Sequence, residues 1–352
     1  MSSFRLTATG DSLVSQDPLT GADPALLDVI RAGDARFTNL EGVVRALDEG
    51  TPAGESGGTW VGISPAHAAR LSAMGFNMFS TAHNHALDWG QDGLLAQSRH
   101  LDALDVCHAG AGANLGAARA PDYLDTPAGR VALVAASTSF HNWNRAGAVR
   151  QDCGGRPGLS GIRVRSRLEV TADDFALLES LSADLQLSSA DDLRVKLGFR
   201  KALPDGELLF LGRSVRRAEQ RRLHEDLDPR DVAGVLASIG EAARQSERVI
   251  FSIHSHQHGD GRLDTPPGWL RDLAGQALQA GADAVIGHGP HILRGIEMMD
   301  GKPVLYSLGN FIFQNETQRV QPADQFELMG LTDSASVADV FDERSRGGGF
   351  AA

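Results

Sequence analysis

The chain has 352 residues, of which 42% are hydrophobic, and it carries a formal net charge of -12 at pH 7. This acidic balance excludes nucleic acid and anionic membrane surfaces as expected partners, because both repel a negatively charged protein. The two cysteines, Cys107 and Cys153, form no CxxC metal motif and no disulfide framework, so we expect reduced thiols.

The N-terminal residues MSSFRLTATGDS contain no basic segment followed by an apolar one and no cleavage site. The sequence also lacks the run of about 18 apolar residues that a transmembrane helix needs. As written, the sequence predicts a soluble, cytoplasmic protein without a transmembrane segment, with envelope association as the alternative if a leader is missing.

Apolar segments of strand length alternate with amphipathic segments of helical length. The pattern predicts strands over 4–10, 35–38, 77–82, 130–137, 248–254, 282–287 and 302–313. It predicts helices over 64–75, 93–104, 228–246 and 265–281. In the first of these, Ser64 is the expected N-cap, Pro65 the first helical residue and Gly75 the end. This alternation is typical of an α/β fold whose sheet is covered by helices on both faces.

The segment from about 145 to 228 differs from the rest because it shows little periodicity. We expect it to form an insertion or cap over the sheet. Its arginines form a basic patch that is either a solvated face or a contact for a carboxylate-bearing substrate: Arg213, Arg216, Arg217, Arg221 and Arg222. The polar tail after Asn315 is expected to contain one short helical piece.

Polar groups of similar chemistry follow most of the predicted strands. They are Asp11, Asn39 and Glu41, then His83, Asn84, His85 and Asp88, then His254, His256 and His258, and finally His288 and His291. If the strands are parallel neighbours, these groups converge on one rim at the carboxyl ends of the strands. Carboxylate, carboxamide and imidazole groups together favour a divalent metal site over a purely structural polar cluster.

Six motifs in order and spacing resemble the CapA (PgsA) family of bacterial capsule and poly-γ-glutamate synthesis proteins. They are TGDSL, FTNLEG, TAHNHALDWGQDGL, SIHSHQHG, GADAVIGHGPHILRGIE and GKPVLYSLGNFIF, and the resemblance extends from residue 5 to about residue 346. It implies a calcineurin-like metallophosphatase fold, a two-sheet α/β sandwich flanked by helices. It also implies one domain over 1–352 with a cap at about 145–228. Related sequences usually continue beyond the terminal GGGFAA, so we expect a truncated C-terminus.

The resemblance assigns roles residue by residue. It implies metal ligation by Asp11, Glu41, Asn84, His254, His288 and His291. It implies a catalytic His85, for which Asp88 is the expected orienting partner, and we place His256 and Asn310 as candidate substrate contacts. Leu13 stands where the metallophosphatase pattern has a histidine, so the site is expected to hold one divalent ion or two of unequal affinity. Mixed oxygen and nitrogen ligands admit Mn, Zn, Fe or Ca.

Three functions agree with this pattern. The first is a metal-dependent hydrolase of capsule or poly-γ-glutamate metabolism that cleaves an amide (γ-glutamyl) or phosphoester bond with metal-activated water. The second is a non-catalytic assembly factor that binds the capsule polymer, for example within a capsule synthase complex. The third is a peptide Cα epimerase that pairs His85 with Asp88 and His291 with Asp11. The expected partner is a polyanionic polymer, a peptide or a small molecule.

Overall fold

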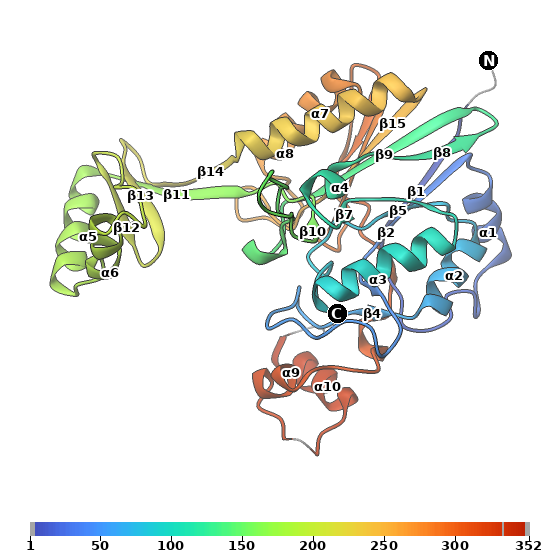
Figure 1. Ribbon diagram of the computed structural model, residues 1–352, viewed down its shortest axis with the longest axis horizontal. Helices are drawn as coiled ribbons and strands as arrows, with labels where there is room; N and C mark the ends of the chain where they lie inside the picture. Colours follow the sequence, from blue (N-terminus) through green and yellow to red (C-terminus); the bar gives the residue numbers. More distant parts are fainter. Residues whose placement is uncertain (1–3, 333, 349–352) are drawn as a thin grey trace. The chain divides into compact units, whose positions relative to one another are not determined.

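The computed structural model describes residues 4–332 and 334–348 of the chain (Figure 1). The chain divides into two compact units. Unit 1 comprises Met1–Ile162 and Arg230–Ala352, and unit 2 comprises Arg163–Pro229. Of the residues expected to form a cap, 145–162 therefore belong to unit 1, and 163–228 belong to unit 2.

The first sheet of unit 1 has five strands in the order β19-β1-β2-β5-β6, and all four neighbouring pairs are parallel. Its strands are β1 (Leu6–Leu13), β2 (Ala35–Leu40), β5 (Met78–Ser80), β6 (Cys107–Ala109) and β19 (Asn310–Phe313). The helices α1 (Pro24–Arg31), α2 (Pro65–Met74) and α3 (Gly90–Ala103) lie along this sheet (Figure 1). Two short parallel strands, β3 (Val43–Val44) and β4 (Gly62–Ile63), pair beside it.

The second sheet of unit 1 has six strands in the order β17-β18-β16-β15-β9-β8. They are β8 (Asp122–Thr126), β9 (Gly129–Ser137), β15 (Arg248–His254), β16 (Ala284–His288), β17 (Ile296–Met299) and β18 (Lys302–Leu305). The two edge strands are antiparallel and the central ones are parallel. The helices α7 (Pro229–Gln245) and α8 (Gly268–Ala280) cover this sheet (Figure 1).

The inner faces of the two sheets form a shared core. Phe37 and Met78 of the first sheet pack in one cluster with Leu133, Ile250 and Ile286 of the second. Each of these side chains is almost completely buried, and full burial of one such side chain stabilises the fold by about 1.5–3 kcal/mol. The predicted fold class, an α/β two-sheet sandwich flanked by helices, is confirmed.

The local signals for α2 are also confirmed. The Ser64 side chain accepts a hydrogen bond from the backbone N–H of His67 at 3.2 Å, Pro65 is the first helical residue, and Gly75 ends the helix with φ +130°. A glycine is needed at this C-cap because L residues rarely adopt a positive φ.

The prediction of one strand over 302–313 is wrong. Lys302–Leu305 form β18 in the second sheet, and Asn310–Phe313 form β19 in the first, so the chain crosses between the sheets at 306–309. Gly309 makes the turn with φ +63°. Gly10 allows the close approach on β1, because a Cβ there would lie 1.9 Å from the Gly309 carbonyl oxygen.

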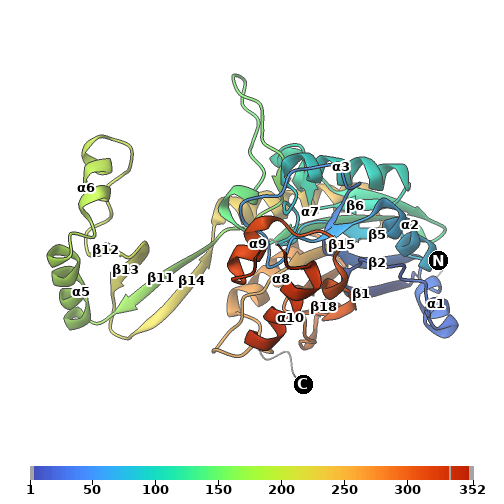
Figure 2. The ribbon, with the colours of Figure 1, turned by 90° about the horizontal axis from the view of Figure 1, so that it is seen from below.

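The tail holds more helix than the one piece expected. After a short 3-10 turn at Asn315–Thr317, it forms α9 (Ala323–Leu328) and α10 (Val337–Gly348), which lie next to each other in red in Figures 1 and 2. Val340 and Phe341 bury the inner face of α10, a contact that the polar composition of the tail concealed. The expectation of a truncated end concerned residues 347–352, of which 349–352 lie outside the described residues.

The remaining elements of unit 1 are small. They are α4 (Leu115–Arg119), the 3-10 turn Asn142–Asn144, and the antiparallel pair β7 (Ala111–Gly112) and β10 (Gly158–Leu159). Within the described part of the chain, no helix combines the length and the apolar character needed to cross a bilayer.

Unit 2 is a four-stranded sheet with two helices. Its strands, in the order β12-β13-β11-β14, are β11 (Val164–Val170), β12 (Glu207–Phe210), β13 (Arg213–Arg217) and β14 (Arg222–Leu227). Its helices are α5 (Ala172–Asp184) and α6 (Ser189–Lys196). Within the basic patch, Arg221 pairs with Asp174, Arg222 pairs with Glu169, and Arg217 stacks on Phe175.

Candidate metal centre

The carboxyl ends of strands from both sheets meet at one place in unit 1. Asp11 near the end of β1 lies in register with Asn39 of β2 and Asn310 of β19, and His254 at the end of β15 lies in register with His288 of β16. Among these paired residues, the first sheet contributes the carboxylate and carboxamide groups, and the second contributes the two imidazoles. A parallel sheet places these groups at one edge because its strands all end on the same side.

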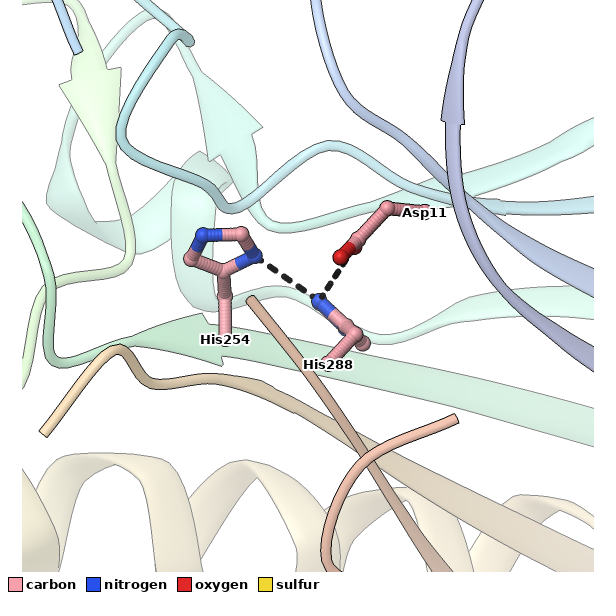
Figure 3. Close-up of side chains that lie close together, drawn as sticks. All are labelled: Asp11, His254 and His288. Carbon is pink, nitrogen blue, oxygen red and sulfur yellow. Dashed lines mark hydrogen bonds and ion pairs between the residues drawn. The ribbon is translucent and has the colours of Figure 1, made fainter. Parts of the chain in front are cut away.

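Asp11, His254 and His288 form the centre of this cluster (Figure 3). All three are completely buried. The Nδ1 atoms of His254 and His288 are 2.9 Å apart, and Nδ1 of His288 is 3.7 Å from Oδ1 of Asp11. Burial alone would raise the pKa of Asp11, but His291 and His288 hold it below its usual value.

Two residues that were not predicted as metal ligands orient these side chains. Asn39 Nδ2 donates to Asp11 Oδ1 at 2.8 Å, and the Oγ of Ser252 lies 2.7 Å from Nε2 of His288. Ser252 occupies Nε2 and so leaves Nδ1 of His288 facing the cluster. The sequence signal for both was weak: Asn39 lay among the polar groups at strand ends, and Ser252 reads as an ordinary strand residue.

Glu41 follows β2 and is also completely buried. Its carboxylate lies 3.7 Å from Nε2 of His254 and 3.9 Å from Nδ1 of His291, and neither of its oxygens has a hydrogen-bond partner among the described residues. Burial, followed by the charge of Asp11, raises the pKa of Glu41 to about 8. A buried carboxylate that accepts no hydrogen bond is a group whose natural partner is a cation.

His291 and His256 complete the imidazole side of the cluster. His291 adopts a positive φ of 60°, and its Nδ1 lies 3.5 Å from Asp11 and 2.7 Å from the side-chain oxygen of Asn310. The Nε2 atom of His256 lies 3.0 Å from Nε2 of His254. His256 therefore lies among candidate ligands, while Asn310 contacts His291 directly.

Asn84, His85 and Asp88 approach from the turn after β5. Nδ1 of His85 donates to Oδ2 of Asp88 at 2.7 Å, which leaves Nε2 available. Burial alone would lower the pKa of His85, but the charge and hydrogen bond of Asp88 raise it above its usual value. Asn84 is oriented by a hydrogen bond from its Nδ2 to the Gly57 carbonyl at 3.0 Å, and its Oδ1 is buried without a hydrogen-bond partner among the described residues.

The loop at 53–58 positions several candidate site residues, and the sequence did not reveal this role. Gly57 donates its N–H to Asp88 at 3.1 Å and accepts from Asn84, so one residue holds both. A Cβ on Gly57 would lie 2.9 Å from the His85 ring. A glycine in a polar loop carries no sequence signal for this packing role.

The donor set fits a divalent cation. Three groups of side chains each bring their ligand atoms within 4.8 Å of one another: Asp11, His254 and His288; Glu41, His254 and His256; and Asp11, Glu41 and His291. Nitrogen and carboxylate oxygen ligands of this kind suit first-row divalent metals. The Glu41 oxygens, which have no hydrogen-bond partner among the described residues, and the close contact between two imidazole nitrogens form an arrangement that such a cation would stabilise.

Two positions adjoining the cluster contribute no ligand to these groups. Leu13 is buried at 1% exposure. His83 is completely buried, packs edge-to-face against His254 with ring centroids 6.2 Å apart, and has a pKa well below its usual value because of burial.

Comparison with known proteins agrees with the resemblance seen in the motifs. Two proteins of Sinorhizobium fredii named Uncharacterized protein y4sH and Uncharacterized protein y4uA are each 34% identical over 338 residues, which cover 92% of this chain and 69% of each relative. The PGA biosynthesis protein CapA of Bacillus subtilis is 36% identical over 93 residues, or 26% of this chain and 24% of that protein. Residues 6–315 match the family described as bacterial capsule synthesis protein PGA_cap. The chain therefore belongs to the PGA_cap family of bacterial capsule synthesis proteins.

Proposed function

We propose that this chain is a metal-dependent hydrolase of capsule or poly-γ-glutamate metabolism that cleaves a γ-glutamyl amide or a phosphoester bond. The observation that carries the proposal is the buried meeting of two carboxylates, Asp11 and Glu41, with His254 and His288. The capsule context comes from the family and from relatives named for PGA and capsule biosynthesis in two Bacillus species.

The candidate residues would have different roles in such a reaction. Asp11, Glu41, Asn84, His254, His288 and His291 would hold the metal, with His256 close to the same ligands. When bound, a divalent metal supplies Lewis acidity and lowers the pKa of a bound water to about 7. Elemental analysis would identify the ion, among Mn, Zn, Fe and Ca, and would count the ions bound per chain.

His85 is the residue that we assign to proton transfer. Asp88 accepts from Nδ1 and supports the protonated ring, so the free Nε2 can donate to the leaving group. Asp88 itself is held by the backbone N–H groups of Val61 at 2.9 Å and Gly57 at 3.1 Å. Its position is therefore independent of the substrate, as an orienting carboxylate requires.

The test combines metal content with turnover. Wild type and His291→Ala, purified without chelator, are analysed by elemental mass spectrometry and assayed on poly-γ-glutamate and on a bis-aryl phosphodiester. His224→Ala is the matched control, because His224 pairs with Asp226 in unit 2 and belongs to none of the candidate metal groups. We expect metal and product in wild type and control, and loss of both in His291→Ala. Metal-dependent polymer binding without product would establish an assembly factor instead, and full activity in His291→Ala would refute the site.

A specific observation favours the epimerase as a second candidate. Two histidine–carboxylate pairs face the same site: His85 with Asp88 at 2.7 Å and His291 with Asp11 at 3.5 Å. An epimerase needs an acid and a base on opposite sides of one carbon, and two such pairs could supply them. Incorporation of solvent deuterium into an intact peptide would identify this reaction, since hydrolysis leaves the Cα–H bond untouched.

A further inference from the structure

A cavity lies beside the turn that carries Asp88. It has a volume of about 350 Å³ and is lined by Ser15, Trp89 and the segments 45–47, 62–67 and 318–320. None of these lining residues belongs to the candidate metal groups. The cavity is large enough for a small ligand, for which pockets start at about 300 Å³.

The lining of this cavity is cationic. It contains Arg45 and Arg319 and no aspartate or glutamate. Arg45 is only 6% exposed, and its guanidinium stacks on the Trp89 ring with Cζ 3.9 Å from the ring centroid. Its Nε and Nη2 groups donate to the carbonyl oxygens of Glu49 and Leu47, so these bonds and the Trp89 ring fix the positive charge beside the cavity.

Hydrogen-bond donors without acceptors adjoin the same cavity. Trp89 Nε1 and Gln318 Nε2 are buried and have no hydrogen-bond partner among the described residues. The Gln318 side chain is fixed in this orientation because its Oε1 accepts from the Gly62 N–H at 3.1 Å. These side chains are 4% and 6% exposed, so water in the bulk solvent does not satisfy them.

Helix α2 begins at this cavity, which adds to the positive potential. Its N-cap Ser64, first residue Pro65 and following residues Ala66 and His67 all line the space. The positive end of the helix dipole therefore points to the cavity, as it does in many anion sites.

We propose that this cavity is a binding site for a small oxyanion, either a carboxylate or a phosphate group. Two buried donors at the wall, Trp89 Nε1 and Gln318 Nε2, have no acceptor among the described residues, and such an anion would supply one beside the two arginines. Two wall residues also adjoin the proton-transfer pair: Trp89 follows Asp88 in the chain, and Gly62 follows Val61, whose N–H binds Asp88. A bound anion thus contacts the segments that hold Asp88 in place. The site goes beyond the proposed hydrolase and does not depend on it.

The test titrates full-length, metal-loaded protein with inorganic phosphate and with glutarate by isothermal calorimetry. Ala66→Glu introduces a carboxylate into the wall at an exposed position near the helix start, where an acidic residue is well tolerated. Ala73→Glu, on the same helix but outside the cavity, carries the same charge change and serves as the control. We expect Ala66→Glu to weaken binding by about tenfold or more, through like-charge repulsion, and Ala73→Glu to leave it nearly unchanged.

Two further variants keep the result decisive. Arg319→Gln removes an exposed cation and should weaken binding with the fold intact, as monitored by circular dichroism. His291→Ala should leave this binding in place, because the cavity shares no residue with the metal groups. Binding that disappears in His291→Ala places the anion at the metal centre and overturns the proposal. Equal binding in Ala66→Glu and wild type, or no heat with either anion, also overturns it.

Discussion

The substitution Glu41→Gln tests the central electrostatic feature of the site. Glu41 is completely buried and its oxygens have no hydrogen-bond partner among the described residues, while burial and Asp11 raise its pKa to about 8 from a usual 4.5. In metal-free protein at a pH between these values, the unfolded chain releases the proton and the folded chain keeps it. The free energy of unfolding therefore falls as the pH rises from 4.5 to 8.

The size of the effect follows from this shift. Between pH 4.5 and pH 8, each pH unit lowers the free energy of unfolding by about 1.4 kcal/mol, so the metal-free protein loses about 3 kcal/mol of stability by pH 7. Glutamine does not titrate, but its buried amide group forgoes about 1 kcal/mol of hydrogen bonding. We therefore expect Glu41→Gln to stabilise the metal-free protein by about 2 kcal/mol at pH 7 and to give no gain near pH 4.5.

Urea unfolding with excess chelator, at pH 5 and at pH 7.5, measures this difference. Adding the metal should reverse the order, because a ligand at 100 times its dissociation constant stabilises wild type by about 2.7 kcal/mol and the variant binds it poorly. A variant that is less stable than wild type at both pH values with chelator present would refute the reasoning, since it would mean that the carboxylate is well paired without a metal.

Three further changes test separate features. Leu13→His introduces an imidazole where the metallophosphatase pattern has one, and we expect the metal-to-protein ratio from elemental analysis to rise; an unchanged ratio would mean that position 13 does not face the metal. Gly57→Ala should lower kcat by about tenfold or more, because its Cβ would displace the groups it packs against. Gly54→Ala, in the same loop with nothing within 4 Å of its Cβ, should leave kcat unchanged, and equal losses in both variants would contradict this role. The backbone N–H of Ala46, followed by His100, holds the pKa of Glu49 at about 2. Ionised Glu49 stabilises the fold above pH 4.5, and this stabilisation is lost as the pH falls toward 2. Glu49→Gln should therefore lower Tm at pH 7, and the difference in Tm from wild type should shrink in acid. A difference in Tm that stays constant with pH would exclude this linkage.

Local patterns in the sequence were sufficient for most elements of the sandwich. The helical spacing of apolar residues and the capping residues located α2 between Ser64 and Gly75. Apolar runs located strands such as Arg248–His254. Such signals act within a few residues of the chain, because caps and side-chain periodicity are set by the backbone of the element itself. They also showed that polar groups follow the strands, which suggested a metal-binding rim before any fold was known.

Only the tertiary structure decided which strands share a sheet and which strand ends meet. The apolar run at 302–313 looks continuous, yet packing assigns its halves to different sheets. The Gly289 N–H reaches Asp11 at 3.1 Å across 278 residues, and no local pattern encodes that contact. Among the described residues Glu41 has no hydrogen-bond partner, and Gly57 packs against the His85 ring; both are likewise properties of the assembled core. Local sequence signals therefore specify most elements and the chemical groups at their ends, whereas the packing of the two sheets against each other brings those groups together.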